Sequence, residues 1–162
     1  YGKTNGVGFM KIRHLRFLTP VLTAILIYSG CAAYAAADSI VIDGIVAEIP
    51  PEMGKISERD NRTFVPVRFV SEFLKYDVWF DTNSRAACIG SSTSLIYVQN
   101  GSNSLFITSL ETGAVTTVTM DTAAYIDSAD NRTYLPIRFL AEALGYKVGW
   151  DESSLTVTLD KL

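Results

Sequence analysis

A segment that returns 70 positions later is the feature that most constrains the fold of this 162-residue chain. Residues 60–69 read Asp-Asn-Arg-Thr-Phe-Val-Pro-Val-Arg-Phe, and residues 130–139 read Asp-Asn-Arg-Thr-Tyr-Leu-Pro-Ile-Arg-Phe. Extended to 60–81 and 130–151, the match needs no gap and keeps 12 of 22 residues identical. Such self-similarity indicates a duplicated structural unit, so the two copies are expected to fold alike.

Each copy has the pattern of an extended segment followed by a short helix. The residue before a proline avoids the helical region, so the chain is expected to be extended up to Pro66 and Pro136. Proline also suits the first turn of a helix, so a helix is expected to begin at each proline and to end near Leu74 and Leu144. Apolar residues with the spacing of one buried helix face follow: Val67, Val70, Phe73 and Leu74, then Ile137, Leu140, Ala141 and Leu144.

The residues after the two helices differ. Gly145 follows the second helix, and glycine readily takes the left-handed conformation that ends helices. The equivalent residue in the first copy is Lys75. The end of the first helix is therefore expected to be strained or built differently.

A hairpin is predicted before and after each helix. Aromatic and β-branched runs follow both helices and are interrupted by the turn residues of 81–84 and 151–154. Before the first helix, Asp43-Gly44 is a strong hairpin turn, and Glu111-Thr112-Gly113 has the same place before the second. The predicted strands are 39–42, 45–49, 76–80, 86–89, 95–99, 105–110, 114–119, 146–150 and 155–159.

These elements predict an α+β fold of two pseudo-repeats, each a hairpin–helix–hairpin, with an antiparallel sheet and two short helices. Repeat one spans about 39–89 and repeat two about 104–160. Together they are expected to form one duplicated domain over residues 38–162.

The N-terminal segment is typical of a secretory signal peptide. Basic residues between Met10 and Arg16 precede an apolar run, Phe17 to Tyr28, and small residues with an A-x-A pattern follow. This order predicts that residues 1–37 are upstream residues plus a signal peptide, that Asp38 is the first mature residue, and that the protein is secreted or held at the cell surface. No function is assigned to the residues before Met10.

Two alternatives to cleavage remain open. The segment could stay as an anchor, but its apolar run is shorter than the roughly 20 residues of a spanning helix. Ser29-Gly30-Cys31 also resembles the end of a lipoprotein cleavage box, although Tyr28 stands where that box prefers leucine. A lipid anchor on Cys31 is therefore an alternative, and no membrane span is expected after signal cleavage.

The predicted mature part is acidic and has few metal-binding side chains. Residues 38–162 contain 10 Lys and Arg against 17 Asp and Glu, a net charge of −7. This charge argues against nucleic acid as a partner. The sequence of this part has no histidine and one cysteine, Cys88, so neither a copper nor a zinc site is expected and no cofactor is predicted.

The repeated motif resembles a known family. Arg-Thr-aromatic-aliphatic-Pro-aliphatic-Arg-Phe, followed by Glu-x-Leu-Gly-Tyr-x-Val-x-Trp-Asp, is similar to the copper amine oxidase N-terminal domain family, also called stalk domains. The second copy matches almost throughout 132–151, whereas the first departs at Lys75 and has Phe80 in place of Trp150. The resemblance implies a non-catalytic accessory module of secreted proteins, without a copper site and without catalytic residues to carry over.

Three residues are candidates for ligand binding. Arg62 and Arg132 can bind carboxylate or phosphate, although they can equally hydrogen-bond loop carbonyls. Trp79 aligns with Gly149 and not with Trp150, so the two tryptophans are predicted to face different sides. If one aromatic side chain of these strands is exposed, it is expected to be Trp79. Structural roles are predicted for the remaining motif residues, Pro66, Arg68, Glu72, Pro136, Arg138, Glu142, Trp150 and Asp151.

Paired acids offer an enzymatic alternative. Asp81 with Asp151, or Glu72 with Glu142, is the kind of pair that hydrolyses glycosides. A duplicated scaffold explains these pairs equally well, because the aspartates open turns and the glutamates lie four residues after Arg68 and Arg138 on a helix.

The favoured hypothesis is a non-catalytic extracellular accessory module that binds cell-envelope polymer or a partner protein. A structural spacer that oligomerises through a strand edge and a small hydrolase using paired carboxylates are the alternatives. The sequence identifies neither the ligand nor the oligomeric state.

Overall fold

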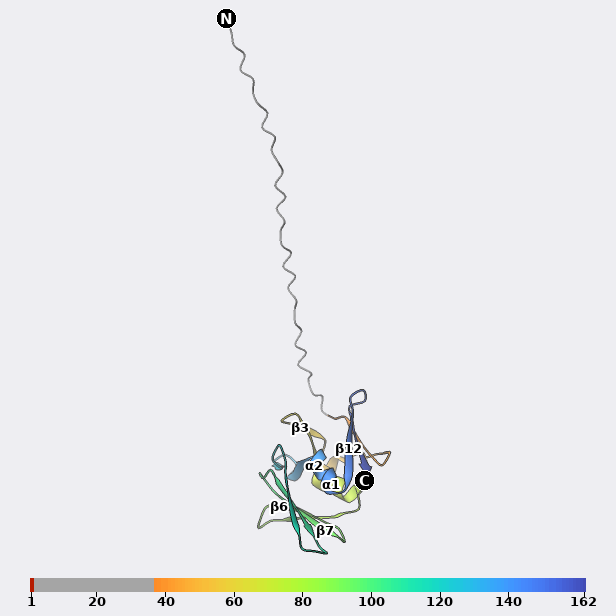
Figure 1. The fold of residues 1–162 in the computed structure, drawn as a ribbon, viewed down its shortest axis with the longest axis vertical. Coiled ribbons are helices and arrows are strands. Elements are labelled where there is room, and N and C mark those ends of the chain that lie inside the picture. Colours follow the sequence, from red (N-terminus) through yellow and green to blue (C-terminus); the bar gives the residue numbers. More distant parts are fainter. Residues whose placement is uncertain (2–36) are drawn as a thin grey trace. The chain divides into compact units, whose positions relative to one another are not determined.

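The computed structural model describes Tyr1 and residues 37–162. The predicted signal peptide and the lipid anchor at Cys31 lie outside these residues. The described chain forms three β-sheets and two α-helices, so the α+β class with mostly antiparallel sheets is confirmed. Within 37–162, neither helix is long enough to cross a membrane. Figure 1 shows α1 (Val67–Phe73) and α2 (Ile137–Ala143) near the middle of this part, with β6 (Ala86–Gly90) and β7 (Ser94–Gln99) below them.

The five-stranded sheet is a simple antiparallel meander. It runs in the order β5-β6-β7-β8-β9, where β5 is Asp77–Asp81, β8 is Ser104–Ser109 and β9 is Val115–Thr119. Its strands therefore come from the end of repeat one and from the segment that precedes the second helix.

The other two sheets have four strands each. One has the order β12-β13-β1-β2, with β12 at Tyr146–Asp151, β13 at Thr156–Lys161, β1 at Ser39–Ile42 and β2 at Ile45–Val46. The other has the order β10-β11-β4-β3, built from Tyr125–Asp127, Arg132–Pro136, Arg62–Pro66 and Ser57–Arg59 respectively. A short 3₁₀ helix, η1, covers Pro51–Met53.

The two repeats meet around a local two-fold axis. Strands β4 and β11 pair antiparallel, with Val65 opposite Leu135 and Phe64 opposite Pro136. Val65 and Leu135 are equivalent positions of the 70-residue repeat, so each copy presents the same strand to the other. Both side chains are fully buried. An isologous contact of this kind is the arrangement of a symmetric dimer, here made within one chain.

The predicted hairpin–helix–hairpin order of the two repeats is not confirmed. The residues of the hairpin that was expected to begin repeat two form β8 and β9. These strands belong to the same sheet as β5 and β6 of repeat one. The hairpin expected to lead repeat one has only a two-residue second strand, Ile45–Val46, in place of 45–49, and Pro50 and Pro51 follow shortly after it. Its first strand pairs in parallel with β13 of repeat two, from Ser39 opposite Thr156 to Ile42 opposite Leu159.

Two short strands that the sequence patterns did not predict precede the helices, one in each repeat. Ser57–Arg59 and Tyr125–Asp127 pair antiparallel with the Pro-ending strands β4 and β11. Each has three residues, which is too short for a period-two alternation of apolar and polar residues to be recognised.

The helices begin and end within a residue of their predicted bounds. Pro66 and Pro136 end their strands and are the N-caps, so the helices start at Val67 and Ile137. The second helix buries its predicted apolar face. In the first helix, Phe73 and Leu74 are only half-buried, and Phe69 is buried in their place.

Lys75 adopts the same left-handed conformation as glycine in the other repeat. Its φ is +66°, and that of Gly145 is +82°. Both amides donate to the equivalent helix carbonyl, Lys75 to Glu72 over 3.0 Å and Gly145 to Glu142 over 3.1 Å. A side chain with a Cβ is disfavoured in this region by roughly 1–2 kcal/mol. Of the two possibilities that the sequence left open for the end of the first helix, the structure has the strained one.

We expect Lys75→Gly to raise the free energy of unfolding by about 1 kcal/mol, because glycine relieves the left-handed strain. Gly145→Lys should lower it by a similar amount. Urea unfolding followed by circular dichroism measures both. Lys75→Ala is the matched control, since alanine keeps the Cβ, and stabilisation by alanine equal to that by glycine would contradict this explanation.

An aromatic cluster packs next to the two-fold axis. Tyr134 is fully buried, stacks on Tyr125 with centroids 5.2 Å apart, and is equivalent to Phe64, whose ring also lies 5.2 Å from that of Tyr125. The Tyr134 hydroxyl donates to Asp130 Oδ2 over 2.6 Å. A Cβ on Gly54, where φ is +103°, would lie 2.6 Å from this hydroxyl, so only glycine fits there.

Burial, followed by hydrogen bonding to Asp130, raises the pKa of Tyr134 from 10.0 to about 12. The fold thus favours the neutral phenol, and its contribution to stability is complete below pH 10 and is lost as the pH rises to about 12.

We expect Tyr134→Phe to lower the free energy of unfolding at pH 7 by about 0.5–1.5 kcal/mol, the net value of a typical hydrogen bond. Phe64 at the equivalent position indicates that phenylalanine can pack there. Between pH 10 and 11.5 the stability of the wild type should fall more steeply than that of the variant. Urea titrations across this range test the prediction, and parallel curves would show that Tyr134 does not titrate as the fold implies.

Candidate functional site

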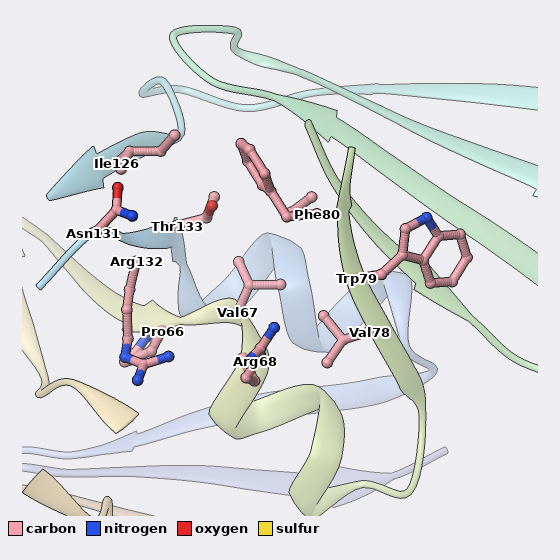
Figure 2. A pocket seen from close by; sticks show the side chains of 11 residues that line it. Pro66, Val67, Arg68, Val78, Trp79, Phe80, Ile126, Asn131, Arg132 and Thr133 are labelled. Carbon is pink, nitrogen blue, oxygen red and sulfur yellow. The ribbon is translucent and has the colours of Figure 1, made fainter. Parts of the chain in front are cut away.

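Two grooves flank the β4–β11 pair and are related by the local two-fold. The first groove, shown in Figure 2, has a volume of about 170 Å³, and the second about 290 Å³. The first is lined by Pro66, Val67, Arg68, Val78, Trp79, Phe80, Ala87, Ile126, Asn131, Arg132 and Thr133. The second is lined by Glu58, Asn61, Arg62, Thr63, Asp121, Pro136, Ile137, Arg138, Phe139, Val148, Gly149, Trp150 and Val157.

Both repeats contribute to each groove. The helix start and the strand that follows come from one copy, and the Asn-Arg-Thr segment comes from the other. Arg68 and Phe80 of the first groove correspond to Arg138 and Trp150 of the second, and Arg132 corresponds to Arg62. A single repeat would therefore form neither groove.

The first groove contains two arginines and no carboxylate among its lining residues. Arg132 donates a hydrogen bond from Nη2 to the backbone carbonyl of Glu52, which fixes the guanidinium without neutralising it. Arg68 has an ion pair with Glu72 at 3.8 Å, in which both side chains are about half exposed. Exposed pairs of this kind contribute little stability, so a ligand can displace Glu72 from Arg68 at small cost. Arg132 has no ion pair among residues 37–162.

The second groove is neutralised from within. Asp121 Oδ2 accepts hydrogen bonds from both Nε and Nη2 of Arg62, each over 2.7 Å. Glu58 also lines this groove. Within residues 37–162, Arg138 forms no ion pair, so the predicted contact with Glu142 is not made at its usual distance. Asp121 therefore offsets the charge of Arg62 directly, and Glu58 adds a second negative charge to the lining of this groove.

Exposed aromatic side chains form part of each groove. Phe80 of the first and Trp150 of the second are 40% and 48% exposed. Figure 2 shows Phe80 extending toward Thr133 and Ile126, whereas the Trp79 ring points away from the cavity. Trp79 is 45% exposed, and its ring lies against Gly90, with Cζ3 3.2 Å from the position of a Cβ there.

The structure divides the three predicted ligand-binding residues between two places. Arg132 and Trp79 line the first groove and Arg62 lines the second, so the three do not form one site. Motif residues with predicted structural roles, Pro66, Arg68, Pro136, Arg138 and Trp150, also line the grooves. Sequence reasoning missed Phe80, Asn131 and Thr133. Asn131 and Thr133 line the groove because the antiparallel pairing of β4 with β11 brings the start of one copy beside the helix of the other. No sequence pattern indicated this pairing.

The paired aspartates of the hydrolase hypothesis are engaged in their own turns. Asp151 accepts hydrogen bonds from the Ser153 amide and hydroxyl over 2.9 and 2.7 Å and from the Ser154 hydroxyl over 2.8 Å. Asp81 accepts from the Asn83 amide and the Ser84 hydroxyl in the same way. Hydrogen bonds from Ser84 to Asp81 and from Ser153 to Asp151 lower the pKa of each carboxyl. A general acid needs a raised pKa, so these residues serve as turn caps.

Metal-binding side chains do not come together in this part of the chain. Among residues 37–162, no three of His, Cys, Asp or Glu lie in an arrangement that could hold an ion. Cys88 is buried in β6, and its burial raises the pKa of the thiol, which disfavours the reactive thiolate.

A protein-family model matches this chain. The model of the copper amine oxidase N-terminal domain covers residues 41–159, a range that contains both repeats and both grooves. No curated protein and no solved structure matches the sequence. In amine oxidases this domain is a non-catalytic stalk module. Since the match extends over most of the sequence, the chain belongs to the copper amine oxidase N-terminal domain family.

Proposed function

We propose that residues 38–162 are a non-catalytic binding module of a secreted or cell-surface protein, and that the first groove binds acidic groups of a cell-envelope polymer. The observation that carries this proposal is the pair Arg68 and Arg132 in a groove whose lining has no carboxylate. Guanidinium groups are well suited to carboxylate and phosphate, which they bind through charge-assisted hydrogen bonds.

The charge of the whole module makes this pair unusual. Residues 38–162 carry a net charge of −7, which repels acidic polymers from the surface in general. Attraction is therefore confined to places where positive charge is uncompensated. In the second groove, Asp121 binds Arg62 and Glu58 adds a further negative charge to the lining, so the first groove is the one suited to an acidic ligand.

The size and walls of the first groove fit part of a polymer. A volume of about 170 Å³ is below the roughly 300–1,000 Å³ of sites that enclose a small molecule. It accommodates one acidic group while the rest of a chain remains outside. Phe80, Val78 and Pro66 provide an apolar wall against which the adjoining part of the polymer can pack.

Two observations support a role without catalysis. The family domain is a non-catalytic accessory module in amine oxidases. In this chain, the turns hold Asp81 and Asp151 in their ionised form, so neither is available as a proton donor.

We expect the purified protein to sediment saturably with isolated cell-wall sacculi and to do so less as salt is raised, because ionic attraction is screened. The double variant Arg68→Gln/Arg132→Gln should bind at least about tenfold more weakly, since a hydrogen bond to a charged group contributes roughly 1.5–3 kcal/mol. Converting the wall carboxylates to amides should weaken wild-type binding to the level of the variant.

Arg62→Gln/Arg138→Gln, in the second groove, is the matched control and should bind as the wild type does. Equal loss in both double variants would indicate a general charge effect and not a site. No sedimentation of the wild type would contradict the proposal and would favour the structural spacer.

A further inference from the structure

Strand β9, Val115–Thr119, is a sheet edge without the usual protection against strand pairing. Its sequence, Val-Thr-Thr-Val-Thr, has only β-branched residues, no charge and no proline. All of its residues except Val118 are exposed. Natural proteins protect such edges with charged residues, proline or very short strands. The other sheet edges have one of these devices: Glu58 and Arg59 on β3, Asp77 and Asp81 on β5, Asp127 on β10, Lys147 and Asp151 on β12, and only two residues in β2.

The hydrogen bonds at both ends of β9 determine which backbone groups are free. The Met120 amide donates to Asn103 over 2.7 Å, and the Ser109 amide donates to Ala114 over 2.9 Å. In an antiparallel pair, hydrogen-bonded positions alternate with positions that point the other way. Residues 114, 116, 118 and 120 therefore bond to β8, and the N–H and C=O groups of Val115, Thr117 and Thr119 point outward from the edge.

We propose that β9 pairs with β9 of a second copy of this chain, antiparallel and around a two-fold axis through Thr117. This register places Thr117 opposite the partner's Thr117 and Val115 opposite the partner's Thr119. All three outward-pointing residues then form hydrogen-bonded pairs, each of which exchanges two N–H···O bonds. No outward backbone group of the strand is left without a partner.

The side chains fit the same register. Val115, Thr117 and Thr119 lie on one face, so across the axis Val meets Thr and Thr meets Thr, which are favourable cross-strand pairs. No like charges meet, because the strand has none. A foreign strand would need a matching sequence, whereas a second copy supplies it by symmetry, and closed two-fold dimers are the commonest assemblies.

The pairing would also extend an aromatic row on the sheet. Trp79, Cys88, Tyr97, Phe106 and Thr117 lie opposite one another on successive strands from β5 to β9. The Tyr97 and Phe106 rings are 6.2 Å apart. With Thr117 on the axis, the row continues into the partner's Phe106, Tyr97 and Trp79, and each dimer carries two copies of the first groove.

The interface is confined to one strand and its neighbours, so we expect a weak dimer. Contacts at the low end of interface size are typical of transient association. The test is therefore the mass of the full chain measured by size-exclusion chromatography with light scattering over a wide concentration range. The mass should rise from 17.8 kDa to twice that value as concentration increases.

Charge variants at the axis test the register. Thr117→Lys places two lysines opposite each other and should give the monomer mass at all concentrations, and Thr117→Glu should do the same. An equimolar mixture of the two variants should recover the dimer mass, because lysine then faces glutamate. Thr82→Lys, on an exposed turn of the same sheet, is the control for added charge and should dimerise as the wild type does.

Amide hydrogen exchange gives a second readout that does not depend on variants. The amides of Val115, Thr117 and Thr119 should exchange more slowly as the concentration of the full chain rises, whereas those of Thr116 and Val118 are already bonded to β8 and should not change. A monomer mass at every concentration would overturn the proposal. So would a dimer that Thr117→Lys leaves intact, or protection at other edges in place of β9.

Discussion

The antiparallel pairing of β4 with β11 is the contact on which the rest of this structure depends. Val65 lies opposite Leu135, and both are excluded from solvent. Because equivalent positions meet, every element that follows one strand has a counterpart related by the two-fold. The helices pack beside this pair, the aromatic cluster of Tyr125 and Tyr134 lies next to it, and the two grooves open on either side. A loss of this pairing would therefore remove both grooves together.

Local patterns were sufficient to predict the parts of the fold that local forces decide. The duplication, the α+β class and the two helices after Pro66 and Pro136 follow from residue spacing and backbone preference. Lys75 in place of glycine indicated that the first helix ends unusually, but not that it keeps the left-handed conformation. What could not be predicted is which strands meet. The parallel contact of β1 with β13 joins residues more than a hundred positions apart, and no residue of Ser39–Ile42 differs from what an antiparallel hairpin would use.

The candidate site was predicted only in part, for the same reason. Arg132 and Trp79 were identified as ligand-binding candidates. Both are among the residues that line the first groove, but the Trp79 ring points away from the cavity (Figure 2). Arg68 was assigned a structural role because its spacing to Glu72 suits a helical ion pair, and that pair forms at 3.8 Å. The sequence could not indicate that Arg68 and Arg132 of different repeats share one groove. That association requires the two-fold axis, which becomes visible only when β4 and β11 are paired.

Duplication gave this chain two grooves, and a few substitutions made them different. Asp121 has no counterpart in the first groove and holds Arg62 through two short hydrogen bonds. Gly149 replaces Trp79, and Trp150 replaces Phe80. The shared residues, Pro, Arg and the Asn-Arg-Thr segment, maintain the shape of both grooves, whereas the divergent ones set their charge and size. Different positions of the same repeat thus determine the shape of the grooves and their specificity. Substitutions at the divergent positions can therefore change the ligand of one groove without disturbing the fold that supports the other.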